Sequence, residues 1–100
     1  MILGNQTMEE SKIETRLNQR VKKLGGLSLK WASPGYIGVP DRIVMLPCGK
    51  IAFVELKTTG KKPRAIQIKR HEELRALGFK VYVVDSYEGV EEILNEVQAS

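Results

Sequence analysis

An apolar run that ends in two charged residues constrains this 100-residue chain more than any other feature. Ile51 to Val54 is apolar enough for a buried strand, and Glu55 and Lys57 follow it. Residues two apart on a strand point to the same face, so Glu55 and Lys57 are predicted to share one side of a sheet. Asp41 opens the preceding apolar segment, and Pro47-Cys48-Gly49 suits a tight turn between the two segments. The pattern predicts two adjacent strands that bring two carboxylates and an ammonium together.

Two carboxylates beside a lysine indicate a particular chemistry. Mg²⁺ takes oxygen ligands in a near-octahedral array, and Asp41 and Glu55 would supply two of them. The Leu56 carbonyl, at the end of the strand, is a candidate third ligand. Lys57 is placed to orient water or to stabilise charge on a phosphate. This interpretation predicts phosphodiester hydrolysis, whereas the competing one is an ordinary cross-strand ion pair.

Periodicity along the rest of the chain predicts one α/β domain. The expected elements are a helix over 8–24, strands over 27–32, 41–46 and 50–57, a helix over 64–77, a strand over 80–85 and a helix over 87–97. Gly25-Gly26 ends the first helix and Ser86 caps the last. The α-β-β-β-α-β-α order is that of a central mixed sheet flanked by helices.

Two of these elements carry finer expectations. In the first strand, Leu27, Leu29 and Trp31 alternate with polar residues. Trp31 is expected to pack in the core, although Trp31 and Tyr36 are also suited to stacking on an unpaired base. In the second helix, the apolar positions are Ile66, Ile68, Leu74 and Leu77.

The composition suits a small globular domain. Apolar residues make up 42% of the chain, and no apolar run is long enough to span a membrane. The N-terminus lacks a secretory pattern, and the single cysteine excludes an internal disulfide, so a cytoplasmic location is expected. We expect residues 1–7 to be a loose leader and residues 8–100 to form the domain.

Basic residues gather after the acidic pair. The formal net charge is +4, which is compatible with a polyanionic partner. The candidates for binding nucleic acid are Lys61, Lys62, Arg64, Lys69 and Arg70, with Lys30 from an earlier segment. A solvated basic face is the alternative interpretation. Cations beside a carboxylate site favour phosphate binding, because they would bring phosphates to the place where a metal could act.

The segments around these residues resemble a known family. Gly38 to Arg42 is G-V-P-D-R, Val54 to Lys57 is V-E-L-K, and Gln67 lies on the next predicted helix. The combination resembles the virus-type replication-repair nuclease domain, VRR-NUC, of the PD-(D/E)xK superfamily, from about Glu10 to Leu94. The resemblance implies a restriction-endonuclease-like core, here in the stand-alone form of bacteriophage members.

The resemblance also implies roles for four of the residues. Asp41 and Glu55 correspond to the metal-binding acids of the family, and Lys57 to its catalytic lysine. Gln67 corresponds to a glutamine that helps to orient the site. All four are therefore candidate catalytic residues.

One helix carboxylate is less specifically marked. The family places a glutamate on the first helix near the metal, where it can act through water. Glu14 is our assignment, and Glu10, one turn earlier on the same face, is the alternative. His71 stands one turn after the glutamine, where some relatives have a tyrosine. We expect His71 to be a solvent-facing helix histidine.

Taken together, these features predict a Mg²⁺-dependent DNA endonuclease, with Mn²⁺ as a plausible substitute. The resemblance favours branched DNA such as four-way (Holliday) junctions, and two symmetric cuts favour a homodimer. For a phage-encoded chain, the location would be the host cytoplasm. The alternative function is a non-catalytic module that binds nucleic acid. A restriction-type enzyme is disfavoured because 100 residues leave little room for a recognition module.

Overall fold

The computed structural model describes residues 7–100. Its elements are α1 (Glu10–Lys23), β1 (Leu27–Lys30), β2 (Arg42–Leu46), β3 (Lys50–Leu56), α2 (Ala65–Ala76), β4 (Val81–Val84) and α3 (Tyr87–Ala99). The predicted α-β-β-β-α-β-α order is confirmed. The expected leader over 1–7 lies outside the described residues except for Thr7. Within the described part of the chain, no helix combines the length and apolarity needed to cross a membrane.

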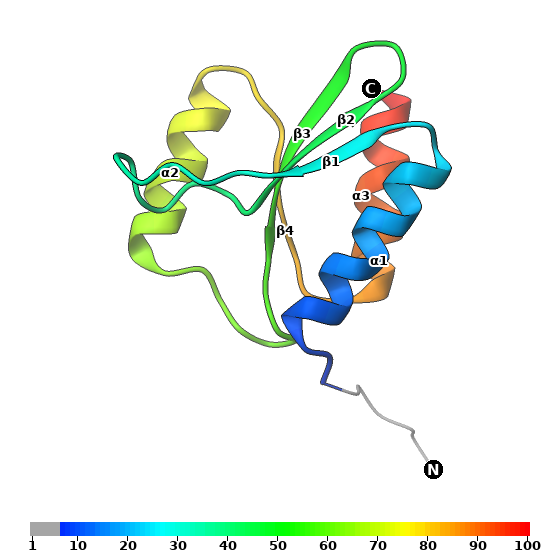
Figure 1. The fold of residues 1–100 in the computed structure, drawn as a ribbon. Coiled ribbons are helices and arrows are strands. Elements are labelled where there is room, and N and C mark those ends of the chain that lie inside the picture. Colours follow the sequence, from blue (N-terminus) through cyan, green and yellow to red (C-terminus); the bar gives the residue numbers. More distant parts are fainter. Residues whose placement is uncertain (1–6) are drawn as a thin grey trace.

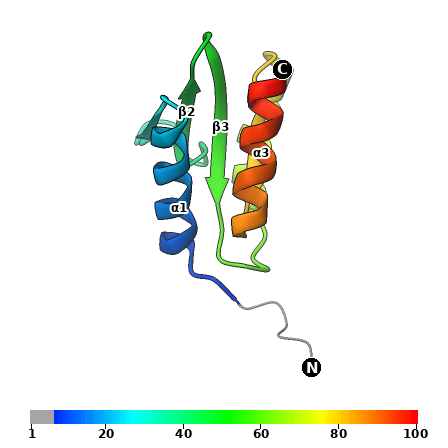
Figure 2. The same cartoon turned by 90° about the vertical axis from the view of Figure 1, so that its right-hand side faces the viewer.

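One four-stranded sheet, in the order β1-β2-β3-β4, separates two layers of helix. β1, β2 and β3 are antiparallel neighbours and β4 runs parallel to β3, so the sheet is mixed. Figure 1 shows α1 and α3 on one side of the sheet and α2 on the other. Figure 2 views this layer face on, with α1 and α3 alongside each other and β3 visible between them.

The main core lies between the sheet and the layer of α1 and α3. Helical spacing puts Ile13, Leu17 and Val21 of α1 on one face, and all three are fully buried. The residues that meet them come from β2, β3, β4 and α3: Val44, Leu46, Ala52, Val54, Leu56, Val84, Val90, Ile93, Leu94 and Val97. Because side chains alternate along a strand, Phe53 and Glu55 of β3 point instead toward α2.

The two ends of α1 have separate causes. Gly25, at φ +83°, donates its N–H to the Lys22 carbonyl, and Gly26 donates to Val21, which ends the helix at the glycines as predicted. The helix begins at Glu10, later than expected. The Met8 N–H donates to Thr59 Oγ1 and the Met8 carbonyl accepts from the Thr59 N–H. These bonds tie the start of α1 to the segment that follows β3.

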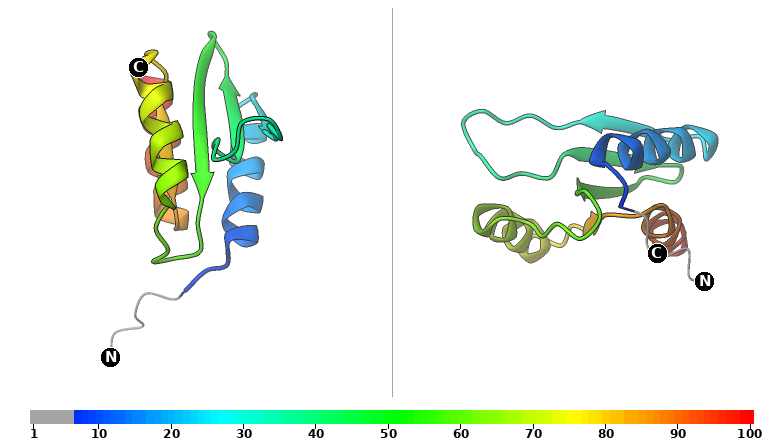
Figure 3. Two further views of the ribbon diagram at one scale, coloured as in Figure 1. Left: turned by 90° about the vertical axis from the view of Figure 1, so that its left-hand side faces the viewer. Right: turned by 90° about the horizontal axis from the view of Figure 1, so that it is seen from below.

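The apolar face of β1 is only partly covered. Trp31, just after the strand, packs on Phe53 with 5.0 Å between ring centroids, but it stays half-buried and outside the core that was expected for it. Leu27 and Leu29 stay 59% and 46% exposed. Figure 3 shows the reason, because α2 lies beside the β4 end of the sheet and β1 lies at the other end. β1 therefore offers solvent a free edge together with two leucines.

The buried face of α2 is polar, which the apolar periodicity did not predict. Gln67 and His71 are 7% and 2% exposed, whereas Ile68 and Leu77 are 46% and 74% exposed. The expectation that His71 faces solvent is therefore wrong. The residues that α2 turns toward the sheet lie over Glu55, so a charged partner on β3 outweighs apolar periodicity in setting the orientation of the helix.

Candidate active site

Asp41 and Glu55 meet at the ends of the two central strands. The register pairs Arg42 of β2 with Val54 of β3, so its next step sets Asp41 opposite Glu55. Asp41 is held in place because its Oδ2 accepts a hydrogen bond from the Leu56 N–H over 2.8 Å. The hairpin thus sets the two carboxylates side by side.

Glu55 is a carboxylate in an unfavourable position. Its side chain is 1% exposed, and no group among the described residues donates a hydrogen bond to its Oε1. Burial and, next, the charge of Asp41 raise the pKa of Glu55 to about 7, although the Lys57 ammonium opposes both. Glu55 is thus a buried acid with an unpartnered oxygen and a second acid beside it. A bound cation would stabilise its ionised form.

Lys57 and Gln67 both contact the other oxygen of Glu55. Lys57 Nζ lies 3.3 Å from Oε2, as two residues on the same strand face allow. Gln67 Nε2 donates to the same Oε2 over 2.9 Å. The oxygen of the Gln67 amide accepts from the Arg64 N–H over 2.8 Å, which fixes the direction of the amide. The first turn of α2 therefore orients the glutamine toward the acid.

His71 is a site residue that the sequence argument missed. Its Nε2 lies 3.7 Å from Glu55 Oε1, beyond hydrogen-bond distance, and neither atom has a hydrogen-bond partner in the described part of the chain. Burial lowers the pKa of His71, and the charges of Arg75 and Lys57 lower it further, so the imidazole is neutral near pH 7. The available signal was spacing, because His71 follows Gln67 by four residues on one helix face.

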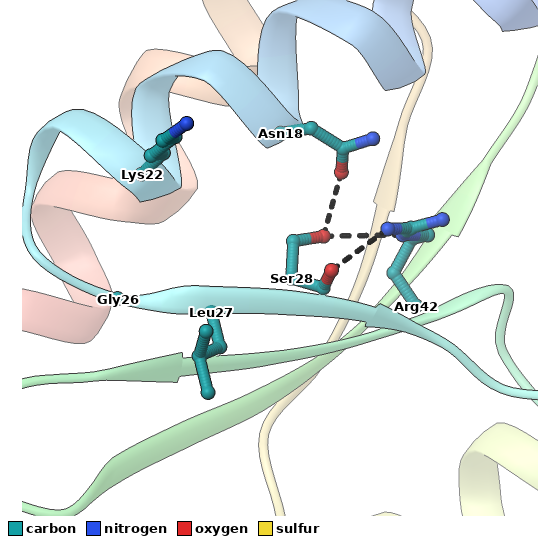
Figure 4. A pocket seen from close by; sticks show the side chains of 6 residues that line it. All are labelled: Asn18, Lys22, Gly26, Leu27, Ser28 and Arg42. Carbon is teal, nitrogen blue, oxygen red and sulfur yellow. Dashed lines mark hydrogen bonds between the residues drawn. The ribbon is translucent and has the colours of Figure 1, made fainter.

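Glu14, the assigned helix carboxylate, is held away from the acids. Its Oε2 pairs with Arg42 Nη1 at 3.2 Å. Arg42 also donates to the hydroxyl and carbonyl of Ser28, and the Ser28 hydroxyl donates to Asn18. Figure 4 shows these bonds at the edge of a cavity of ≈ 310 Å³ between α1 and β1. Strand alternation sets Arg42 and Glu55 on opposite faces of the sheet.

Glu10, the alternative helix carboxylate, is coupled to the acids. Burial raises the pKa of Glu10, and the charge of Asp41 raises it further while Lys57 lowers it. The charge of Glu10 in turn contributes to the raised pKa of Glu55. The Glu10 N–H donates to Thr58 Oγ1 over 3.3 Å, which ties this end of α1 to the residue after Lys57.

Comparison with known proteins bears on the fold and the family. No family model matches the chain. Over 79 residues, 79% of this chain and 85% of its relative, it is 51% identical to "Putative nuclease p44" of Acyrthosiphon pisum secondary endosymbiont phage 1. A solved VRR_NUC domain matches it with a TM-score of 0.81 at 37% identity, over 86% of this chain and 94% of that one. The chain belongs to the VRR-NUC family.

The restriction-endonuclease-like fold expected for a VRR-NUC domain is confirmed, and the family is one of nuclease domains. Within residues 7–100, no three His, Cys, Asp or Glu side chains form a ready-made metal cluster. The VRR-NUC site nevertheless fits a hard cation, because Glu55 Oε1 is buried without a partner and Asp41 lies opposite. Two carboxylates with water are an ordinary ligand set for Mg²⁺, which keeps several waters.

The basic residues expected to bind nucleic acid have different environments in this VRR-NUC domain. Lys61, Lys62 and Arg64 are exposed in the segment between Lys57 and α2, and Lys69 is exposed on α2. Arg70 instead stacks on Tyr36 and donates from Nε to the Ile37 carbonyl over 2.8 Å. Lys30 is exposed on β1, where alternation directs it to the α1 side.

Proposed function

We propose that this chain is a Mg²⁺- or Mn²⁺-dependent endodeoxyribonuclease that hydrolyses phosphodiester bonds in branched DNA such as four-way junctions. One observation carries the proposal. Glu55 is a buried, ionisable acid opposite Asp41, with a pKa raised to about 7 and one oxygen left without a partner. A fold retains such a costly arrangement for chemistry rather than for stability.

Asp41, Glu55 and the Leu56 carbonyl would hold the cation. Bound there, it would polarise the scissile phosphate and make water a better nucleophile at neutral pH. The cation would also offset the repulsion between the two acids, which favours the ionised form of Glu55. The hydrogen bond from the Leu56 N–H keeps Asp41 in position for this role.

Lys57 would contact the phosphate rather than help to hold the cation. The Lys57 side chain is 14% exposed and its ammonium lies 3.3 Å from Glu55 Oε2, so the lysine is largely buried and held at the site. A fixed ammonium in a low-dielectric site stabilises the negative charge that grows on phosphate oxygens during attack. With Glu55 holding a cation, Lys57, on the same strand face, would remain close enough to contact the substrate phosphate.

Two further residues would complete the site from the helices. The Gln67 amide, already oriented by the Arg64 N–H, holds Glu55 from the α2 side. From α1, we assign the water-mediated carboxylate to Glu10 in place of Glu14. Glu10 is coupled to Asp41, whereas Glu14 is paired with Arg42 on the other side of the sheet.

The exposed basic residues support DNA as the substrate. Lys61, Lys62 and Arg64 follow Lys57 directly along the chain, so phosphates that they bind would lie beside the acids. Lys69 extends this cluster along α2. Phosphate contacts of this kind give affinity and position without sequence recognition.

A homodimer would fit a branched substrate with two-fold symmetry. A junction resolved symmetrically needs two cuts, and each chain has one pair of acids. The free edge of β1 and the exposed Leu27 and Leu29 support an isologous contact through this end of the sheet. A second copy would cover leucines that α2 leaves open.

The alternative is a module that binds nucleic acid without cutting it. Exposed basic residues would suffice for such a module, and it would gain nothing from the burial of Glu55 beside Asp41. The energetic cost of that pair favours the enzyme.

A panel of labelled flap, splayed-arm, bubble, four-way and linear duplex DNAs tests the proposal. With Mg²⁺ we expect discrete nicks in branched substrates, much slower cutting of linear duplex, and no cutting in EDTA. Asp41→Asn and Glu55→Gln should bind the same substrates without cutting them. Binding by the wild type with no cutting of any substrate would instead favour the non-catalytic module.

A further inference from the structure

A second cavity opens on the α2 side of the sheet, in line with the acids. It has a volume of ≈ 210 Å³ and lies between α2 and the segment that joins β1 to β2. Trp31, Tyr36 and Val39 line it from the segment, and Arg70, Glu73 and Leu74 line it from α2, with Leu77 just after the helix. The Glu73 carboxylate is paired with Arg70 and accepts from the Tyr36 hydroxyl. Apart from Arg70, which the sequence suggested as a contact to nucleic acid, none of these residues belongs to the acid site.

The wall formed by the β1–β2 segment is fixed against α2. Gly38 adopts φ +90°, and a Cβ there would lie 2.9 Å from the Ile66 carbonyl, so only glycine lets the segment come this close. Arg70 Nε donates to the Ile37 carbonyl over 2.8 Å, and the Tyr36 hydroxyl donates to Glu73. The cavity is therefore preformed rather than dependent on a loop closing.

The sheet register sets one wall of the cavity beside the acids. β1 pairs Lys30 with Arg42, so the next step sets Trp31 opposite Asp41, and the Trp31 N–H donates to the Asp41 carbonyl over 2.8 Å. Trp31, Asp41 and Glu55 thus form one row across three strands and point to the same face. Neighbouring strands are about 4.8 Å apart. The aromatic wall therefore starts about one strand spacing from Asp41.

The lining has the chemistry of a stacking site. The Arg70 guanidinium lies 3.7 Å from the centroid of the Tyr36 ring, so a planar cation and an aromatic ring are already stacked. Trp31 adds a second aromatic surface, supported from behind by Phe53. Leu74 and Leu77 supply apolar contact, and Leu77 is 74% exposed. A flat, weakly polar ring next to a phosphate matches this lining better than a peptide or an acyl chain does.

We propose that this cavity receives an unpaired nucleobase adjacent to the phosphate that is cut. The inference rests on the proposed nuclease function and gives it a substrate class, namely DNA with at least one unpaired nucleotide at the cleavage position. Base stacking on aromatic side chains tolerates any base, so the site reads strandedness rather than sequence. Flaps, splayed arms and bubbles present such a nucleotide and an intact duplex does not, whereas in a four-way junction a base at the crossover would have to leave its pair.

The fluorescence of Trp31 tests the proposal directly, because it is the only tryptophan in the chain. Lys57→Ala protein with Mg²⁺ is titrated with a short oligothymidine and with an oligomer of the same backbone that carries no bases. We expect the oligothymidine to quench the emission and to bind roughly fivefold to hundredfold more tightly than the baseless oligomer, the usual range for a stacked base. Equal affinities, or no quenching by oligothymidine, would overturn the proposal.

A matched pair of variants isolates the cavity. Tyr36→Ala should remove most of the preference for bases, and its ring is 47% exposed, so folding should not suffer. Tyr87→Ala should keep the preference, because that ring carries an equivalent Arg16 stack, at 3.9 Å, outside the cavity. A preference for bases that survives Tyr36→Ala would contradict the assignment.

The two proposals fail separately. Cutting of branched DNA by the wild type without base-dependent quenching would overturn the base pocket and leave the nuclease. Base-dependent quenching without cutting of any DNA would support the pocket and overturn the nuclease.

Discussion

Gln67 donates a hydrogen bond from its amide to Glu55 over 2.9 Å, so the first turn of α2 is part of the acid site on β3. The amide cannot turn round without losing the bond that its oxygen accepts from the Arg64 N–H. A helix terminus and a strand end are thereby connected through one side chain. The connection explains why α2 presents polar residues to the sheet.

Replacing Gln67 tests this connection. Gln67→Leu keeps the size of the side chain and removes the donor, so Glu55 should lose its orientation. We expect a loss of roughly 10- to 100-fold in cleavage rate or Mg²⁺ affinity, as is usual when a partner of a metal ligand is removed. Single-turnover cleavage and metal titration measure the two effects. Gln19→Leu, exposed on α1, is the control, and equal rates for both variants would remove Gln67 from the site.

Stability without metal should depend on pH through Glu55. The folded-state pKa is raised from 4.5 to about 7, so the unfolded chain releases this proton at lower pH than the folded chain does. The contribution of Glu55 to the free energy of unfolding is therefore full below pH 4.5 and is lost as the pH rises through about 7. The loss should be on the order of 3 kcal/mol.

Urea denaturation in EDTA measures this dependence. His71 acts in the opposite direction, because its lowered pKa costs stability as the pH falls. Subtracting the free energy of unfolding of Glu55→Gln from that of the wild type removes the contribution of His71. We expect the wild type to lose stability relative to Glu55→Gln between pH 4.5 and about 7, and Mg²⁺ to restore it. If the difference in free energy of unfolding between the wild type and Glu55→Gln does not change with pH, the folded state does not raise the pKa of Glu55.

Substitutions of Glu10 and Glu14 should have different effects on cleavage and on stability. Glu10→Gln should weaken Mg²⁺-dependent cleavage about tenfold, because a carboxylate coupled to Asp41 is lost. Glu14→Gln should leave cleavage intact and lower stability by less than about 1 kcal/mol, the usual size of a partly exposed ion pair. Cleavage rates and urea midpoints of both variants decide the matter. The reverse pattern would restore Glu14 as the helix carboxylate.

Self-association should depend on the exposed leucines of β1. Leu29→Glu places a charge on the surface that we assign to the dimer, so sedimentation should show a monomer where the wild type shows a dimer. Ile68→Glu on α2 is a matched control, because Ile68 and Leu29 are each 46% exposed. A wild type that is monomeric, or two variants that dissociate equally, would contradict the assignment.

The fold and the pair of acids could be predicted because their signals are local. Strand patterns, the turn at 47–49 and the glycines after α1 each act within a few residues, and together they determine the hairpin that sets Asp41 opposite Glu55. The orientation of α2 could not be predicted in this way. Its apolar residues suggest one face, whereas bonds to Glu55 select another and bury His71.

The helix carboxylate was ambiguous for a related reason. Glu10 and Glu14 share one face of α1, and neighbouring sequence does not tell them apart. The difference comes from Arg42, which lies far along the chain and pairs with Glu14. The exposure of Leu27 and Leu29 likewise depends on the position of α2 over the sheet, and no pattern within β1 predicts that position.

The most direct test of the account is the effect of Lys57→Ala on a labelled four-way junction. With Mg²⁺, we expect single-turnover cleavage by Lys57→Ala to fall at least about a hundredfold. We also expect a mobility shift to show unchanged binding of the junction, and EDTA to abolish cutting by the wild type. Cutting by Lys57→Ala at the wild-type rate, or wild-type cutting that persists in EDTA, would contradict a metal-dependent site built on Asp41, Glu55 and Lys57.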